Sequence, residues 1–144
     1  YGYLLSPTPV VEQPAQTTVG GIRGFTIDND GTAPSGFKAG FVLMGNVGTS
    51  LVLADANPLG QKFQIDGTNW LAGDRFVIDT RPGTRGVWRG AGGGALVSIL
   101  SGVNASVSEW MTLYHGANDF TLNTAAFDWD LAYKFTHQPA YWGV

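Results

Sequence analysis

The sequence predicts an all-β protein whose strands form a two-sheet antiparallel β-sandwich, with minimal helix. Short runs of β-branched, aromatic and aliphatic residues alternate with clusters of Gly, Pro, Asn and Asp along most of the chain. Several runs alternate apolar and polar residues with period two, which gives each strand one apolar face and one polar face, as in two packed sheets. No segment of helical length keeps a 3.6-residue apolar period.

The composition indicates one folded domain with a sizeable core. The chain has 144 residues, of which 44% are hydrophobic and 13% charged, and it has no cysteine. Its 21 glycines fit a fold with many tight corners. A net charge of −3 with scattered basic residues argues against nucleic-acid binding, and the densest cationic group, Arg81, Arg85 and Arg89, lies in a Pro/Gly turn region. No apolar run approaches the ~20 residues of a membrane-spanning helix.

The first part of the chain, residues 1–21, is predicted to be a Pro-rich linker or arm, and residues 22–144 the β-sandwich domain. Pro7, Pro9 and Pro14 remove backbone donors and favour extended structure. We expect the arm to cross to another domain or subunit, because its apolar residues have too little local sequence to form a core. The chain begins with Tyr1, so we also expect it to be a piece of a longer protein.

Turn clusters such as Asp28-Asn29-Asp30-Gly31, which we expect to form a hairpin turn, divide the domain into strands. The expected strands cover approximately residues 22–27, 38–44, 50–54, 61–65, 75–79, 86–89, 95–100, 109–114, 118–122 and 128–135. Their period-two pattern predicts a set of largely buried side chains. These are Phe63, Ile65, Phe76, Ile78, Phe120, Leu122, Trp129, Leu131 and Tyr133.

Motifs that carry chemistry are weak in this sequence. The acidic turn at 28–31 resembles the start of a calcium loop, but Phe37 stands where the late bidentate Glu belongs. The glycine run 90–94 lacks the Gly-Lys-Ser/Thr of a phosphate-binding loop. His115 and His137 are isolated, without further zinc ligands or a nucleophile motif. We therefore predict no catalytic residue, no cofactor, no metal site and no enzyme activity.

Two pairs of residues leave alternatives open. Asp74 and Asp79 could face each other as a glycosidase-like pair, although carboxylates at a turn and a strand end commonly accept backbone hydrogen bonds. Trp70 and Trp88 are tentative contacts for a glycan or a protein partner. The alternative for both tryptophans is core or interface packing, which is common for this residue type.

Four stretches resemble, in order and spacing, a known family. They are residues 27–34, 70–80 with Gly-Asp-x-x-x-Ile-Asp-Thr, 110–120 with Leu-x-x-Gly-x-Asn, and 140–143 with Tyr-Trp. Together they are similar to the C-terminal domain of siphophage distal tail (Dit-like) proteins. The structural motif positions are Gly31, Gly73, Asp74, Ile78, Asp79, Gly116 and Asn118.

This resemblance implies a galectin-like, jelly-roll-like sandwich in the tail tip of a bacteriophage virion. The expected role is a distal tail or baseplate hub component, a docking scaffold that serves host attachment. The implied partners are other tail proteins, namely the tail tube, the tail-tip hub and a receptor-binding protein, with a homo-hexamer in the virion. No nucleic acid and no membrane are expected as partners. The alternative function is a carbohydrate-binding β-sandwich module for host-surface glycans.

Overall fold

The structure is a computed structural model that describes residues 3–5, 10–12, 16–19, 22–43, 45–55, 60–123 and 133–142. Its strands are β1 (Tyr3–Leu5), β2 (Val10–Glu12), β3 (Gln16–Val19), β4 (Ile22–Asn29), β5 (Phe37–Val42), β6 (Ser50–Asp55), β7 (Lys62–Asp66), β8 (Arg75–Asp79), β9 (Gly86–Gly90), β10 (Leu96–Ser98), β11 (Gly116–Asn123), β12 (Tyr133–His137) and β13 (Ala140–Trp142). The only helical elements of the described residues are two 3₁₀ turns, η1 (Ala91–Gly93) and η2 (Leu100–Gly102).

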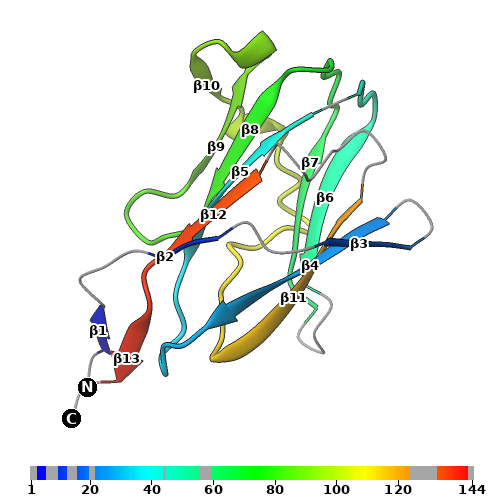
Figure 1. The fold of residues 1–144 in the computed structure, drawn as a ribbon. Helices are drawn as coiled ribbons and strands as arrows, with labels where there is room; N and C mark the ends of the chain where they lie inside the picture. The colour runs from blue at the N-terminus through cyan, green and yellow to red at the C-terminus, as the bar shows by residue number, and fades with distance from the viewer. Residues whose placement is uncertain are drawn as a thin grey trace.

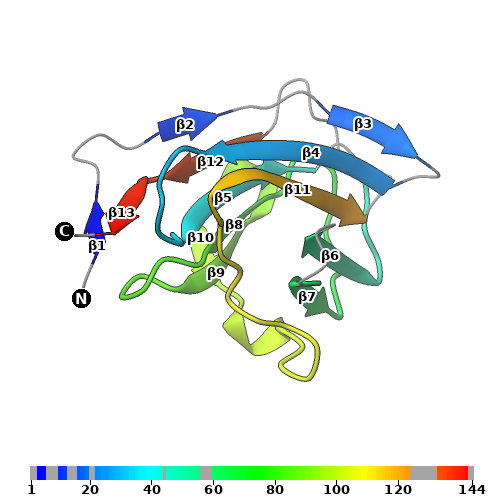
Figure 2. The same ribbon diagram turned by 90° about the horizontal axis from the view of Figure 1, so that it is seen from below.

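These strands form two large antiparallel sheets that face each other (Figures 1 and 2). One sheet has the order β10-β9-β8-β5-β12-β2 and the other the order β3-β4-β11-β6-β7, while β1 and β13 form a separate pair. The prediction of an all-β sandwich with minimal helix is confirmed. No helix of the described residues is long and apolar enough to cross a bilayer.

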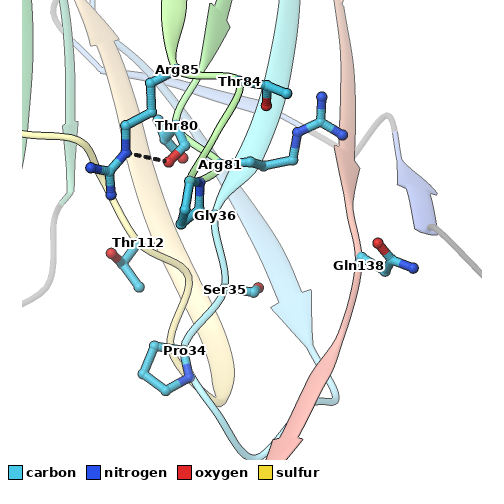
Figure 3. Close-up of a pocket in the computed structure, with 10 residues that line it drawn as sticks. Pro34, Ser35, Gly36, Thr80, Arg81, Thr84, Arg85, Thr112 and Gln138 are labelled. Carbon is cyan, nitrogen blue, oxygen red and sulfur yellow. Dashed lines mark hydrogen bonds between the residues drawn. The ribbon is translucent and has the colours of Figure 1, made fainter. Parts of the chain in front are cut away.

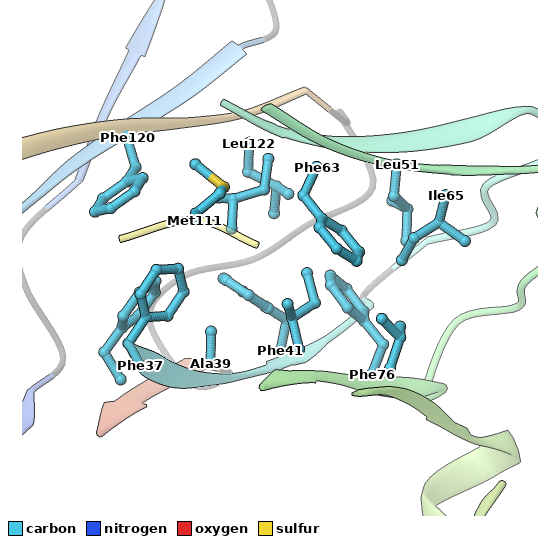
Figure 4. Close-up of a cluster of buried hydrophobic side chains, with 14 of the residues drawn as sticks. Phe37, Ala39, Phe41, Leu51, Phe63, Ile65, Phe76, Met111, Phe120 and Leu122 are labelled. Atoms are coloured by element: carbon cyan, nitrogen blue, oxygen red, sulfur yellow. The ribbon is translucent and has the colours of Figure 1, made fainter. Parts of the chain in front are cut away.

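The core fills the space between the two sheets (Figure 4). Phe37, Phe41 and Phe76 point into it from the six-stranded sheet, and Phe63 and Phe120 from the five-stranded sheet. The rings of Phe41 and Phe76 stack at a centroid distance of 4.9 Å. Burying so many large apolar side chains stabilises the fold at about 25 cal/mol per Å² of apolar surface.

Most of the predicted core is confirmed. The side chains of Phe63, Ile65, Phe76, Ile78, Phe120 and Leu122 are all at least 98% buried. Trp129 and Leu131 lie outside the described residues. Tyr133 opens β12, but its side chain is outside the description. The alternation in β7 and β11 places every second residue in the core, as the period-two rule requires.

The strand predicted at 109–114 is wrong. Met111 and Leu113 are buried, which explains the alternating pattern, but the segment runs between the sheets with only one bridge, from Leu113 to Ser35. The Gln61 side chain takes the place of a strand partner: its Oε1 accepts from the Thr112 amide at 2.7 Å. The strand predicted at 95–100 is confined to β10, and the predicted strand 128–135 is described only from residue 133 onward.

The hairpin predicted at 28–31 is also wrong. This turn leads from β4 in one sheet toward β5 in the other, so it joins the two layers. The Asn29 Oδ1 atom accepts from the Gly31 amide at 3.0 Å and closes a tight Asx-type turn. A Cβ atom on Gly31 would overlap the Ala140 backbone, so the residue at this position must be a glycine.

The described parts of the N-terminal arm are extended, and they pair with sheet edges of the same chain. β1 pairs with β13, β2 with β12 and β3 with β4, all antiparallel. We expected the arm to cross to another domain or subunit. The described segments of the arm instead pair with strands of their own chain. An open sheet edge offers the unpaired N–H and C=O groups that an extended segment needs.

Candidate docking surfaces and the turns that frame them

Asp74 is the centre of a hydrogen-bond cluster at one end of β8. Its side chain is 4% exposed. Oδ2 accepts from the Leu71 amide at 3.0 Å, and Oδ1 accepts from the Gly92 amide at 2.8 Å. Arg89 donates to Oδ2 from Nε at 3.0 Å and forms an ion pair with it. Burial alone would raise the pKa of Asp74, but the donors Gly92, Leu71 and Arg89 together hold this pKa below its ordinary value.

This cluster fastens three segments together: the turn at 71–74, strand β9 through Arg89, and η1 through Gly92. The Arg89 guanidinium also lies 5.6 Å from the centroid of the Trp70 ring, a cation–π distance. Both carboxylate oxygens of Asp74 are therefore engaged by protein donors, and the cluster positions the loop that carries η1.

Asp79 makes the corresponding arrangement at the other end of β8. Its Oδ1 accepts from the Arg81 amide and from Arg81 Nε, each at 3.0 Å, and its Oδ2 pairs with Arg81 Nη2 at 2.8 Å. Burial would raise the pKa of Asp79, but the bidentate Arg81 and its amide lower this pKa overall. The expected strand-end role of Asp79 is what the geometry shows.

The glycosidase-like pair of Asp74 and Asp79 is not formed. The two residues lie just before and at the end of the five-residue strand β8, on the order of 17 Å apart along its axis. Paired catalytic carboxylates of glycosidases lie about 5 to 9.5 Å apart. Each acid also has an arginine of its own.

The corner at residues 114–118 is built around the buried Asn118. Its Oδ1 accepts from the Tyr114 amide at 2.9 Å and its Nδ2 donates to the Tyr114 carbonyl at 2.8 Å. Two of the three motif glycines, Gly116 with φ +91° and Gly73 with φ +89°, occupy backbone conformations that other residues rarely adopt. His115 Nδ1 lies 3.0 Å from the Gly31 carbonyl, which joins this corner to the turn between the sheets.

The two histidines belong to different elements of the fold. His115 belongs to the corner just described, and His137 is buried in β12. Among the residues that the structure describes, no group of three or more His, Cys, Asp or Glu side chains could hold a metal ion.

A groove of about 420 Å³ opens at one end of the sandwich (Figure 3). It is bounded by residues 34–36, the turn at 80–85, Thr112 and Gln138. Arg81 on its wall is neutralised by Asp79. Arg85 donates from Nε to the Thr80 carbonyl at 3.2 Å and lies 5.9 Å from the Trp110 ring. Arg85 has no carboxylate partner within the described residues, so the groove carries one positive charge that an acidic partner group could meet.

The two tryptophans singled out as contacts differ. Trp70 is 4% exposed and packs edge-on against Phe76 at 5.1 Å, so its ring belongs to the core. Trp88 is half-buried on the outer face of the six-stranded sheet, opposite Val77. Its ring lies over Gly86, where a Cβ atom would fall only 2.7 Å from the indole Cζ2. Of the two, only Trp88 has a ring that a partner or a sugar could touch.

One surface was missed by the sequence motifs. Residues 91–98 are all exposed, and this stretch includes β10, the edge strand of the six-stranded sheet. Its exposed large apolar side chains are Leu96 (38%) and Val97 (65%); further along the chain Leu100 (49%) and Val107 (43%) are exposed as well. A signal did exist in the sequence: residues 90–108 contain no charged residue.

These features define an all-β sandwich domain with tightly bonded corners, one charged groove and one apolar edge. The sequence matches no protein-family model and no curated protein. The structure is similar to the crystal structure of the SPP1 Dit (gp 19.1) protein, presented as a paradigm of the hub adsorption apparatus in phages that infect Gram-positive bacteria. The TM-score is 0.64 and the sequence identity 10%.

That similarity covers 97% of this chain and 49% of the SPP1 Dit chain, so this chain spans about half the length of that protein. It shows that the two share a Dit-like fold. This fold agrees with the fold that the four short motifs imply.

Proposed function

We propose that this chain is a structural component of a bacteriophage tail tip, of the distal tail hub type, which docks other tail proteins and catalyses no reaction. The observation that carries the proposal is the fold match to a phage hub adsorption protein along nearly the whole chain. A fold alone does not fix a function. The proposal rests on the fold together with the motif order at Gly31, Gly73-Asp74, Asp79 and Asn118.

The chemistry of the described residues suits a scaffold. Asp74 and Asp79 are both bonded to arginines and backbone amides, where they fix turns. The surfaces left for partners are the Arg85 groove and the apolar edge at β10. On this proposal the Arg85 groove contacts the tail tube, the hub or a receptor-binding protein, and six copies assemble in the virion.

The direct test is to locate the chain in virus particles. Antibodies against the chain, applied to particles of the phage that encodes it, are expected to label the end of the tail remote from the capsid in negative-stain micrographs. Binding in the presence of excess free chain gives the specificity control. Label on the capsid, or purified particles that lack the chain by mass spectrometry, would contradict the proposal.

A carbohydrate-binding module is the second candidate, and the half-buried ring of Trp88 is the observation that favours it. A flat indole on an exposed sheet face can stack on a sugar ring. A glycan array with the intact chain, the Trp88→Ala variant and the Tyr114→Ala variant separates the two functions. Hits that survive Tyr114→Ala and vanish with Trp88→Ala establish sugar binding, and an array without hits favours the protein scaffold.

A further inference from the structure

The open edge of the six-stranded sheet has the features of a self-complementary contact. β10 is the last strand of that sheet, and no described strand pairs with its outer side. Natural edge strands are usually protected by charges, prolines or bulges that prevent pairing with another strand. β10 has none of these: it reads Leu96-Val97-Ser98 and sits inside the uncharged stretch 90–108.

The register with β9 shows which backbone groups point outward. Ile99 donates to the Val87 carbonyl at 2.9 Å, and Val97 lies opposite Arg89 two residues earlier. Because hydrogen-bonded pairs alternate along an antiparallel ladder, Val97 and Ile99 direct their N–H and C=O groups to β9. Leu96 and Ser98 therefore direct theirs to the open side.

We propose that β10 pairs antiparallel with β10 of a second copy of this chain, about a two-fold axis that passes through Val97. In this register Leu96 lies opposite Ser98 of the other copy, and the outward N–H and C=O groups of both residues form four hydrogen bonds. The two Val97 residues meet as the close, non-hydrogen-bonded pair. The two six-stranded sheets become one continuous sheet.

The charge pattern selects a second copy as the occupant. In a two-fold contact residue i meets residue j, and only the residue on the axis meets its own counterpart, so a charge at the axis would meet a like charge. Val97 at the axis is uncharged, as is the whole stretch from residue 90 to residue 108, and Arg89 beside it on β9 is paired with Asp74. The pairing also covers Val97, the most exposed of the large apolar side chains of the described residues. A contact centred on one short strand is small, so the association is weak and depends on concentration.

The main test is sedimentation equilibrium of the intact chain over a wide concentration range. The wild type is expected to show a monomer–dimer equilibrium. Val97→Lys places two ammonium groups at the axis and is expected to weaken association at least tenfold. Ser98→Pro removes an outward N–H without touching the β9 ladder, and is expected to do the same. Ala117→Lys adds the same charge on the exposed face of β11 and is the matched control, with wild-type association.

A cysteine variant tests the register itself, since the chain has no native cysteine. Cβ atoms of a close antiparallel pair lie about 4.5–5.5 Å apart, so Val97→Cys is placed for a disulfide across the axis. Val107→Cys, exposed but off the strand, is the control. Mild oxidation is expected to produce dimers from Val97→Cys several times faster than from Val107→Cys.

Circular dichroism confirms that each variant remains folded before it is interpreted. A wild type that stays monomeric at the highest concentrations, or equal cross-linking of the two cysteine variants, overturns the pairing. Binding of Val97 and Ser98 to a different tail protein, with no self-association, overturns it as well. The pairing does not depend on the proposed tail role, so antibody-labelled tails and a monomeric chain together would refute only the pairing.

Discussion

The two sheets of this sandwich end differently, and the difference separates an edge that the chain closes from one that it leaves open. At β7, the last strand of the five-stranded sheet, residues 103–109 run alongside. The Asn104 amide donates to the Gln64 carbonyl and the Glu109 amide to the Lys62 carbonyl, each at 2.9 Å. At β10, the last strand of the six-stranded sheet, no described segment does this.

The contrast shows that a short strand at a sheet edge need not be exposed, since β7 is covered and β10 is not. Both edges are built from short strands with apolar residues, and the chain has covered one of them with its own loop. The same loop, residues 99–109, leaves β10 and then crosses to β7. This loop covers the edge at β7 and leaves the edge at β10 without a described partner, so the β10 edge can receive a second strand.

The largest expected effect is in the core behind β7. Phe63 is 2% exposed and packs 5.2 Å from Trp110. Phe63→Ala is expected to lower the free energy of unfolding by about 3–5 kcal/mol, because the lost packing leaves a cavity. Val97→Ala on β10 is the control, with a change within about 0.5 kcal/mol. Urea unfolding of both variants measures this, and similar losses would mean that β10 is buried in the isolated chain.

The second expected effect concerns the anchor that holds the loop of β10. Asp74→Ala leaves Arg89 and two backbone amides without their acceptor. We expect the free energy of unfolding to fall by up to about 3–5 kcal/mol, with the lower end favoured because Arg89 is partly exposed. Asp66→Ala, which removes an exposed carboxylate at the end of β7, is expected to change the free energy of unfolding by about 1 kcal/mol or less. Comparable unfolding midpoints for the two variants would show that the anchor contributes little.

A pH titration should reveal the same anchor and its counterpart at Asp79. The pKa of each carboxyl is lowered in the folded state, so the unfolded chain binds protons more readily as the pH falls. Their contribution to stability is fully present above the ordinary pKa of 3.8 and is lost as the pH falls toward the folded value. As the pH falls below about 4, the urea concentration at the unfolding midpoint is expected to decrease, and to decrease less steeply in the Asp79→Asn variant. If the midpoint of that variant falls with pH as steeply as that of the wild type, Asp79 does not contribute to the pH dependence of stability.

Sequence patterns predicted the layers better than they predicted the surroundings of single residues. Period two identified β7 and β11 because burial acts on every second residue of these strands. The expected strand at 75–79 is also present as β8, although four consecutive residues of it are buried. The same pattern failed at Met111 and Leu113, where the Gln61 side chain replaces a strand.

The candidate contacts show the same limit. Trp70 follows a turn in sequence, yet it lies in the core, since long-range packing against Phe76 decides its exposure. Asp74 was recognised as a corner residue, but its partners Arg89 and Gly92 are 15 and 18 residues away. Nothing local in the sequence identifies them. The only sequence signal for the open edge at β10 is the absence of charged residues from 90 to 108. This signal does not indicate which strand pairs with β10.

The smallest expected effect is at the closed edge itself. The Gln64 amide donates to Ser108 Oγ at 2.9 Å, and the Ser108 hydroxyl lies 3.2 Å from the Gln64 carbonyl. Ser108→Ala removes this partner from a half-buried amide, at an expected cost of about 1 kcal/mol. Hydrogen exchange at Gln64 is then expected to accelerate by roughly fivefold, toward the fast exchange expected at the outward amide of Ser98 in dilute solution. Ser106→Ala in the same loop, whose hydroxyl has no bond to β7 among those described, is the control. If Gln64 and Ser98 exchange at equal rates in the wild type, residues 103–109 do not close the β7 edge in solution, and the contrast between the two edges fails.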